Sequence, residues 1–420
     1  MSFVVPLIIF TALGALAIFA ALKTVEVEER GWLRVVLFAA FVLRIVAAAI
    51  FEIFPNLRVF HEDASGYEHT GMVLALSWQG KYEPIEISGQ NIGYQIFCGV
   101  ICYLFGVYRF NVPLANCLIG SLTVFLIYQL SRKFVHIRVA RMAAGLVAFT
   151  PSMILWSGMA LKDTVMTFLI VLALSSCVSL KQRIRPLPII GIVLALAAIQ
   201  PMRFYMAYFV GFAVVATLAI ERGSRLVAGV YKQVALVGLL VAVIMLTGTS
   251  GRLVQDSETF DLARVSSFRR GMAHSAQSGF SHDVDLSTPE KALAFLPIGL
   301  ATLLFSPFPW QVVSLRPLLA APETYAWWLL FPATVRGILF VARRRFAEAS
   351  PLFVFMVTLS CGYSLTHGNL GSGFRQRAQV FVFFFVFTAI GWYLKKCRRL
   401  GIDEDLLLRR DSSSGAGTGA

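Results

Sequence analysis

The chain is a series of apolar runs, several of which reach the roughly 20 residues that a helix needs to cross a bilayer. The stretches from Phe3 to Leu22 and from Leu33 to Phe54 are the first two, and others follow almost to the C-terminus. Within a membrane the backbone must satisfy its own polar groups, which leaves only helices or a closed barrel. A barrel would show short segments of alternating hydrophobicity instead. The sequence therefore predicts an all-α fold, a polytopic transmembrane helical bundle.

The composition of the 420-residue chain agrees with this prediction and excludes other classes of protein. Hydrophobic residues make up 57% of the chain and the mean hydropathy is +0.73, which is far more apolar than a soluble protein of this size. The net charge of +14 would suit a nucleic-acid-binding protein, but Lys and Arg stand in short clusters between the apolar runs. The positive-inside rule accounts for such clusters. We therefore expect no nucleic-acid partner.

The basic clusters orient the predicted spans. They lie at residues 132–141, 181–185, 222–232, 343–345 and 395–399. If all of them face the cytoplasm, the spans alternate consistently, with the start of the chain outside and its end inside. We therefore expect a multi-pass membrane protein with about eleven spans. These predicted spans are residues 2–22, 33–54, 112–131, 140–158, 164–180, 187–200, 204–220, 227–247, 326–342, 351–367 and 378–395.

Two further apolar runs cannot cross the membrane in this topology, because a crossing would invert everything after it. One is residues 92–108, and the other is residues 292–310, which contain Pro297, Pro307 and Pro309. Proline disfavours a continuous spanning helix but is compatible with a short re-entrant one. We interpret both runs as interfacial or re-entrant helices on the outer face. A topology in which both runs span the membrane is the alternative.

The runs and clusters together predict one integral membrane domain, residues 1–400. Residues 401–420 follow the last basic cluster and end in a segment rich in Ser and Gly, so we expect a disordered cytoplasmic tail. The predicted outer loops are residues 55–111, 159–163, 248–291 and 368–377.

Ionisable residues gather at 61–69, directly after the second apolar run. Asp63, followed four residues later by Tyr67, is compatible with a general base that acts on a substrate hydroxyl. A solvated loop carboxylate would explain an isolated aspartate equally well. The predicted topology, however, places Asp163 and its neighbour Lys162 at the same face of the membrane. Two carboxylates that converge at one outer interface favour a functional site.

Arginines on the outer face depart from the positive-inside rule. Arg375 and Arg377 lie in the predicted outer loop between two strongly apolar runs. The forked donors of arginine match phosphate oxygens, so these residues suit the binding of a phosphate group. An interfacial anchor on an ordinary turn is the competing interpretation. Arg203 and Arg109 are weaker candidates of the same kind.

Three short motifs connect these residues to a known group of enzymes. Asp63 and Tyr67 form an Asp-x-x-x-Tyr pattern, and a Pro-Ser-x-x-x-Trp-Ser run leads to Asp163. The third motif, Asn-x-Gly-x-x-x-Arg-x-Arg, begins at Asn369. Over about residues 33–395 the chain resembles the GT-C superfamily of polytopic glycosyltransferases, in particular bacterial relatives of the dolichyl-phosphate-mannose protein mannosyltransferases.

The resemblance implies roles for individual residues. An acidic residue of the first outer loop acts as the catalytic base or binds the acceptor, which maps to Asp63 with Glu62 as the alternate. An acidic residue of the second loop organises the site or a divalent cation, Mg²⁺ or Mn²⁺, which maps to Asp163. The first outer loop carries interfacial helices, as proposed here for residues 92–108. The chain shows no large soluble C-terminal domain, which argues against oligosaccharyltransferase-type members.

These observations lead to one main functional hypothesis. The chain is expected to be an inverting glycosyltransferase that uses a polyprenyl-phosphate-linked sugar at the outer face of the bacterial cytoplasmic membrane. Its partners would be that lipid donor, a glycan or lipid acceptor of the cell envelope, and the surrounding membrane lipids. Tyr67, Lys162, Arg203, Asn369, Arg375 and Arg377 would bind substrate.

Two alternative functions stay open. One is a polysaccharide polymerase or ligase acting on undecaprenyl-diphosphate glycans, which external arginines and a long outer loop also suit. The other is a transporter or flippase for lipid-linked glycans. Transporters place ionisable residues within their spans. Here the charged residues gather at the ends of the apolar runs, and Arg44 is one of few inside them. This distribution disfavours the transporter.

Overall fold

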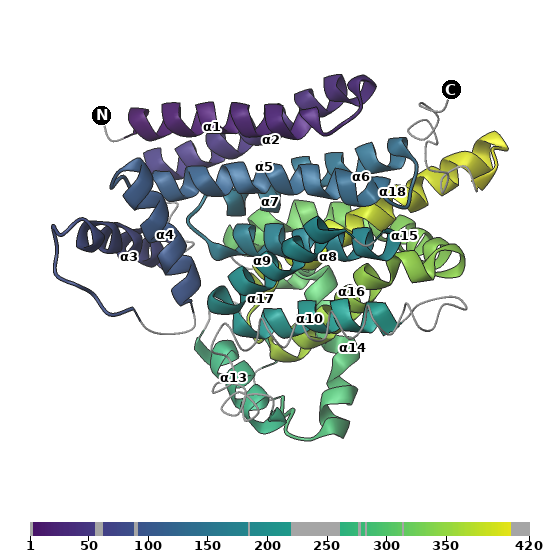
Figure 1. The fold of residues 1–420 in the computed structure, drawn as a ribbon. Coiled ribbons are helices and arrows are strands. Elements are labelled where there is room, and N and C mark those ends of the chain that lie inside the picture. The colour runs from purple at the N-terminus through teal and green to yellow at the C-terminus, as the bar shows by residue number, and fades with distance from the viewer. Residues whose placement is uncertain are drawn as a thin grey trace.

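A computed structural model describes residues 3–54, 62–87, 91–183, 185–219, 261–275, 279–281, 284–312 and 315–404. The described residues form helices and the segments that connect them, with a single isolated β-bridge between Gly279 and Asn369. Figure 1 shows these helices packed as one bundle, with α1 and α2 along one side of α5. Their bounds are α1 (Val4–Lys23), α2 (Val27–Ile53), α3 (Glu62–Trp78), α4 (Ile92–Phe105), α5 (Asn111–Arg132), α6 (Ile137–Phe149), α7 (Pro151–Ser157), α8 (Lys162–Gln182), α9 (Pro186–Met202), α10 (Phe204–Ala219), α13 (Leu262–Ser275), α14 (Pro289–Phe305), η3 (Pro309–Gln311), α15 (Leu315–Arg344), α16 (Phe346–Thr366), α17 (Leu370–Gln376) and α18 (Ala378–Leu400).

Seven of the described helices are long and apolar enough to cross a membrane, or eight if α6 and α7 form one bent span. The predicted all-α membrane bundle is thereby confirmed, whereas the count of about eleven spans is not. The apolar helices α4, α9 and α10 have only 14 to 17 residues. At 1.5 Å per residue they extend roughly 21–26 Å, less than the hydrocarbon core of about 30 Å. The predicted span 227–247 lies outside the described residues.

The predicted span at 140–158 is divided into two helices in the structure. Helix α6 ends at Phe149, α7 begins at Pro151, and their axes differ by 57°. The cause is local, because a proline pushes the residue before it out of the helical region. Thr150 accordingly has an extended backbone, with φ −68° and ψ 121°. The break places the short helix α7 between α2, α5 and α8.

Arg44 of α2 compensates for this break. A helix end leaves its last carbonyl groups without partners inside the helix. The buried guanidinium of Arg44 donates to the carbonyl of Ala148 at 3.1 Å and to that of Val147 at 3.5 Å. It also donates to the carbonyl of Ala40 in its own helix at 3.0 Å. An arginine inside an apolar span therefore has a structural partner, the broken end of α6.

The predicted outer loop 55–111 contains two helices among its described residues. Helices α3 and α4 pack side by side at one end of the bundle (Figure 1). Tyr67 packs edge-on against Tyr94 at 5.0 Å between ring centroids, and Trp78 packs on Tyr103 at 6.2 Å. The apolar run expected to lie at the interface therefore forms α4, which covers one face of α3.

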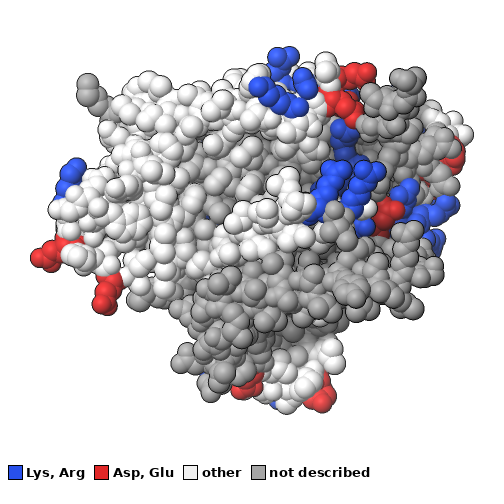
Figure 2. All heavy atoms as spheres, viewed as in Figure 1, with Lys and Arg blue, Asp and Glu red and all other residues white. Residues whose placement is uncertain are grey.

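The two ends of the bundle differ in charge. Helices α8 and α18 both begin near the predicted outer residues and end in basic clusters. At the basic end Lys181 of α8 donates to the carbonyl of Ala347, close to the start of α16, at 2.7 Å. Figure 2 shows most of the visible Lys and Arg side chains on the side of the molecule where α6, α15 and α18 lie in Figure 1. This separation agrees with the orientation predicted from the sequence.

Introduced cysteines should report that orientation directly. In Ser65→Cys and Ser372→Cys, at the α3 end of the bundle, the thiol should react with an impermeant maleimide added outside intact cells. In Arg183→Cys, at the basic end, it should react only after permeabilisation. Five native cysteines are buried and Cys361 is half-buried, so labelling is compared with that of the parent chain. Labelling of Arg183→Cys in intact cells would show that the predicted orientation is wrong.

Candidate active site

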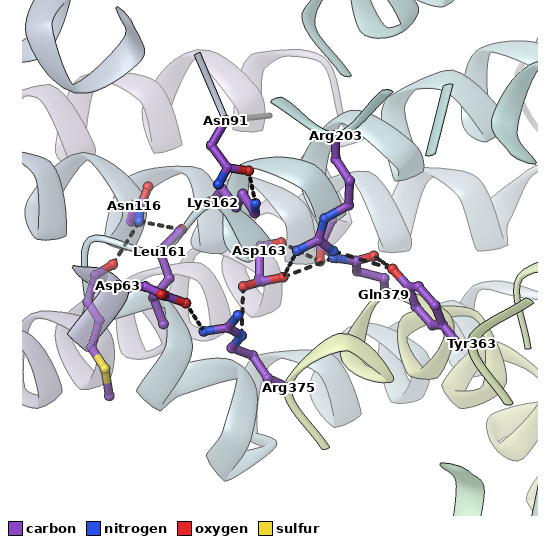
Figure 3. Close-up of polar contacts among 12 residues, drawn as sticks. Asp63, Asn91, Asn116, Leu161, Lys162, Asp163, Arg203, Tyr363, Arg375 and Gln379 are labelled. Carbon is purple, nitrogen blue, oxygen red and sulfur yellow. Dashed lines mark hydrogen bonds and ion pairs between the residues drawn. The ribbon is translucent and has the colours of Figure 1, made fainter. Parts of the chain in front are cut away.

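Asp163 is the centre of a buried ion-pair network. It lies in the first turn of α8, where the helix dipole favours a carboxylate, and it is 3% exposed. One carboxylate oxygen, Oδ1, lies 3.2 Å from the guanidinium of Arg203. The other, Oδ2, lies 3.2 Å from Nε of Arg375 (Figure 3). A buried charge requires such partners, so Asp163 is held as a carboxylate by two arginines.

The network continues into the bundle through Tyr363 and Gln379. Gln379 donates to Oδ1 of Asp163 at 3.2 Å and accepts a hydrogen bond of 2.7 Å from the hydroxyl of Tyr363. Arg203 in turn donates to that hydroxyl at 3.4 Å. These contacts join α8, α16, α18 and the junction between α9 and α10. The geometry of Asp163 is therefore fixed from several helices at once.

Arg375 bridges the buried carboxylate to an exposed one. Its NH1 donates to Oδ2 of Asp63 at 3.2 Å, while its Nε faces Asp163. The side chain of Asp63 is 58% exposed, that of Arg375 is 15% exposed, and that of Asp163 is 4% exposed. Figure 3 shows the guanidinium of Arg375 between the two carboxylates. The predicted convergence of Asp63 and Asp163 is thus seen in the structure, with Arg375 between them.

Tyr67 and Lys162 border this group. Burial, followed by the negative charge of Asp63, raises the pKa of the Tyr67 phenol to about 12, so it is a neutral hydrogen-bond donor at ordinary pH. Lys162 precedes Asp163 and donates to the side-chain oxygen of Asn91, at the start of α4. Three basic side chains, those of Lys162, Arg203 and Arg375, therefore gather around two carboxylates, which favours an anionic ligand.

Three residues that position the site were not among the candidates predicted from the sequence. Tyr363 and Gln379 complete the network around Asp163. Asn116 of α5 donates to the carbonyl groups of Met159 and Leu161 at 2.8 and 3.0 Å, which fixes the segment that leads into α8. Gln379 and Asn116 are polar residues inside predicted spans. That placement is costly in a membrane and was the available signal.

The remaining candidates from the sequence are not part of the ion-pair network around Asp163. Arg377 is 2% exposed and donates to the carbonyl of Ser306 at 2.6 Å and to the hydroxyl of Thr324 at 2.9 Å, so its contacts join α18 to α15. Asn369 caps α17 through the amide of Gly371 at 2.8 Å. The side chain of Glu62 lies outside the described residues. Arg109 pairs with Glu68 of α3.

The described donors do not fit a resident divalent cation. A cation of this kind needs several oxygen, nitrogen or sulfur ligands, and the described residues contain no group of three or more His, Cys, Asp or Glu side chains that could hold one. The carboxylates of Asp63 and Asp163 already face the guanidinium of Arg375. Among the described residues, the positive charge that lies between these two carboxylates is that of Arg375.

An apolar groove runs along the outside of the bundle behind the site. It has a volume of about 920 Å³ and is bordered by α6, α7, α15 and α18. At one end Glu323 accepts hydrogen bonds from the amide and hydroxyl of Ser152, at 2.6 and 2.7 Å. Trp156 of the same helix α7 packs edge-on against Phe374, the residue before Arg375. Helix α7 therefore lines the groove through Pro151 and packs through Trp156 on the residue before Arg375.

Part of the chain matches a family model. Residues 92–247 match the model of the dolichyl-phosphate-mannose-protein mannosyltransferase family. Asp163 and Arg203 lie inside this stretch, whereas Asp63 and Arg375 lie outside it. The resemblance drawn from the sequence motifs is thereby confirmed for these residues. No curated protein sequence matches the chain.

Solved structures share the fold of the chain. ArnT from Cupriavidus metallidurans, in a crystal structure bound to undecaprenyl phosphate, is 14% identical with a TM-score of 0.54, over 88% of this chain and 62% of that one. The oligosaccharyltransferase AglB from Archaeoglobus fulgidus, in complex with an inhibitory peptide and a dolichol-phosphate, is 10% identical with a TM-score of 0.49, over 94% and 53%. The chain thus spans less than two thirds of either protein. The likeness to ArnT confirms the predicted GT-C fold.

Proposed function

We propose that the protein transfers a sugar from a polyprenyl-phosphate-linked donor to a hydroxyl of a cell-envelope acceptor, at the outer face of a bacterial cytoplasmic membrane. The observation that carries this proposal is the contact of 3.2 Å between Asp63 and Arg375. It places the exposed carboxylate of Asp63 beside the guanidinium of Arg375, which also forms an ion pair with buried Asp163. A base and a phosphate-binding group at one end of an apolar bundle are what such a transfer requires.

Asp63 acts as the general base. Its carboxylate takes the proton of the acceptor hydroxyl, whose oxygen attacks the anomeric carbon of the donor sugar. The bond from that carbon to the phosphate oxygen breaks, and its electron pair leaves with the polyprenyl phosphate. Because attack and departure occur on opposite faces of the sugar, the anomeric configuration inverts. The exposure of Asp63 leaves its carboxylate open to an acceptor.

Arg375 binds the leaving phosphate. The phosphate gains negative charge as the sugar leaves, and donors aimed at that charge lower the barrier. Arginine has five N–H donors in a rigid fork, more than its contacts with Asp63 and Asp163 use. The ion pair with buried Asp163 fixes the orientation of the fork before substrate arrives. Lys162 and Arg203 add positive potential around the same point.

The apolar groove suits the lipid part of the donor. Its lining is largely aliphatic and aromatic, and it follows α6 and α15 along the bundle. An isoprenoid chain needs such a surface, whereas a soluble nucleotide sugar does not. ArnT, which shares the fold, was crystallised with undecaprenyl phosphate. The match to the mannosyltransferase family model also supports a lipid-phosphate sugar as donor.

Substitution of Arg375 tests the assignment of the phosphate-binding group. Arg375→Ala should weaken binding of a polyprenyl phosphate by about 10- to 100-fold, because a charge-assisted contact is lost. Arg375→Lys should lie between this variant and the parent, since lysine keeps the charge but not the fork. Binding is measured with purified protein and a fluorescent polyprenyl phosphate.

Arg109→Lys provides the matched control. Arg109 lies at the same end of the bundle but pairs with Glu68, so its replacement should leave binding nearly unchanged. A panel of polyprenyl-phosphate sugars is then tested for transfer by the parent protein. Parent-like binding by Arg375→Ala would remove Arg375 from the donor site, and no transfer from any donor of the panel would contradict the proposed function.

A further inference from the structure

A second cavity lies at the opposite end of the bundle from Asp163. It has a volume of about 590 Å³ and lies between the final turns of α15 and α18. Leu339, Phe340 and Leu394 form an apolar part of its wall, and among the described residues Glu404 is the one acid that lines it. Glu404 pairs with Arg398 at 2.5 Å. The basic residues that line the cavity are Arg336, Arg343, Arg344, Lys395, Arg398 and Arg399.

The packing of α15 against α18 determines where these residues meet. The two helices run parallel, because Arg377 contacts Thr324 at 2.9 Å and, further along both helices, the hydroxyls of Thr334 and Thr388 lie 2.7 Å apart. They approach closely through two glycines. A Cβ on Gly337 would lie 1.9 Å from the carbonyl oxygen of Phe387, and one on Gly391 would lie 1.8 Å from that of Ala333. Beyond this contact both helices continue for about 12 Å and end in basic residues. The close packing therefore brings the basic side chains of the two helix ends together.

Arg336 distinguishes this cluster from an ordinary solvated helix end. It lies eight residues before Arg344, about 12 Å deeper along the helix, within the apolar segment Pro317–Arg344. Its side chain is exposed and lines the cavity. A charged side chain at that depth is unfavourable in hydrocarbon unless it meets an anion or water. The positive-inside rule accounts for the terminal basic residues but not for an arginine at this position.

We propose that this cavity binds the phosphate headgroup of an anionic phospholipid from the cytoplasmic leaflet. Basic pockets between membrane helices on this side suit such headgroups. Six basic residues face one acid, which is already paired, and Arg336 extends the positive lining below the helix ends. The apolar wall and exposed Trp392, at 52%, offer a surface for an acyl chain and an interfacial anchor.

The site is distinct from the proposed donor site. The donor phosphate would bind Arg375, shortly before the start of α18, whereas this cavity lies at the C-terminal end of that helix. A bound headgroup would bridge α15 and α18 at their basic ends, as Arg377 bridges them at the other. The lipid therefore has a structural role, and its binding does not depend on the proposed transfer reaction.

Lipid binding to the purified full-length protein tests the proposal. Native mass spectrometry and thermal unfolding are recorded with phosphatidylglycerol, with zwitterionic phosphatidylcholine, with inorganic phosphate and with a polyprenyl phosphate. Among phosphatidylglycerol, phosphatidylcholine and inorganic phosphate, we expect only phosphatidylglycerol to bind saturably and to stabilise the protein. Polyprenyl phosphate should bind at the proposed donor site, so its binding should be the same in the parent and in the cavity variant described next. The double variant Arg336→Gln/Arg343→Gln should weaken phosphatidylglycerol binding roughly 30-fold, because each basic residue near a membrane surface contributes about a factor of five.

The matched control removes the same charge elsewhere at the basic end. Arg183→Gln/Arg185→Gln changes two exposed arginines outside the cavity and should bind phosphatidylglycerol like the parent. If the first double variant does not fold, Arg336→Lys, which keeps the charge, should fold and retain binding. Equal weakening by both double variants would reduce the site to general surface charge. Preference for inorganic phosphate over phosphatidylglycerol, or a loss of polyprenyl-phosphate binding in Arg336→Gln/Arg343→Gln, would overturn the phospholipid assignment.

Discussion

Replacement of Asp63 by Asn is expected to slow sugar transfer by about 10²- to 10⁴-fold, the contribution of a general base. The amide keeps the shape of the carboxylate but cannot take a proton at neutral pH. The fold should be little affected, because the side chain of Asp63 is 58% exposed and Arg375 keeps its ion pair with Asp163; ion pairs of exposed carboxylates contribute on the order of 0–1 kcal/mol. The measurement is the rate of transfer at saturating donor, together with binding of the polyprenyl phosphate.

Glu62→Gln is the control for this prediction. It removes the adjacent carboxylate in the sequence and should reduce transfer less than Asp63→Asn does. If Glu62→Gln abolishes transfer while Asp63→Asn remains active, the base is the neighbouring residue. If both variants transfer sugar at the parent rate, neither Asp63 nor Glu62 is the base.

Asp163→Asn is expected to destabilise the protein itself, by about 3–5 kcal/mol of unfolding free energy. The reason is that Arg203 would lose its carboxylate partner inside the bundle, where both side chains are 4% exposed. Arg375 would lose its fixed orientation, so transfer should also fall in any protein that remains folded. Denaturant unfolding in detergent measures the stability, and transfer is measured on the folded fraction.

Asp63→Asn is the matched comparison for stability, since it makes the same chemical change at an exposed partner of the same arginine. The double variant Asp163→Asn/Arg203→Gln should recover part of the lost stability, because it leaves no unpaired charge on Arg203. Equal unfolding free energies for Asp63→Asn and Asp163→Asn would show that the buried network does not stabilise the fold.

The sequence predicted that the site residues lie at one face of the membrane, because the topology alone determines the face. Asp63, Asp163 and Arg375 each border an apolar run, and the basic clusters place all three borders at one face. The structure then brings them into contact. The roles of Arg375 and Arg377 could not be separated in this way. Residues two apart on a helical segment point about 200° apart, so only one can face the site.

Other features depend on tertiary packing that a single sequence does not show. Gln379 contacts Asp163, and Tyr363 contacts Gln379. These contacts form only because α16 and α18 pack beside α8 with these two side chains turned toward it. The bend at Thr150 had a visible cause in Pro151, but the pattern of hydrophobicity continues through it. Hydropathy therefore predicted that the chain forms a bundle of apolar helices, but it did not show the break between α6 and α7.

The contact between Arg44 and the broken end of α6 also bears on how the chain is assembled in the membrane. The guanidinium belongs to the second helix, but the carbonyl of Ala148 that it meets is 104 residues further along the chain. Until α6 has been synthesised, α2 carries a charged group that lipid alone solvates poorly. Packing of α6 against α2 therefore gives this charge its long-range partners, and we expect α2 to become stable in the bilayer only once α6 has been inserted beside it.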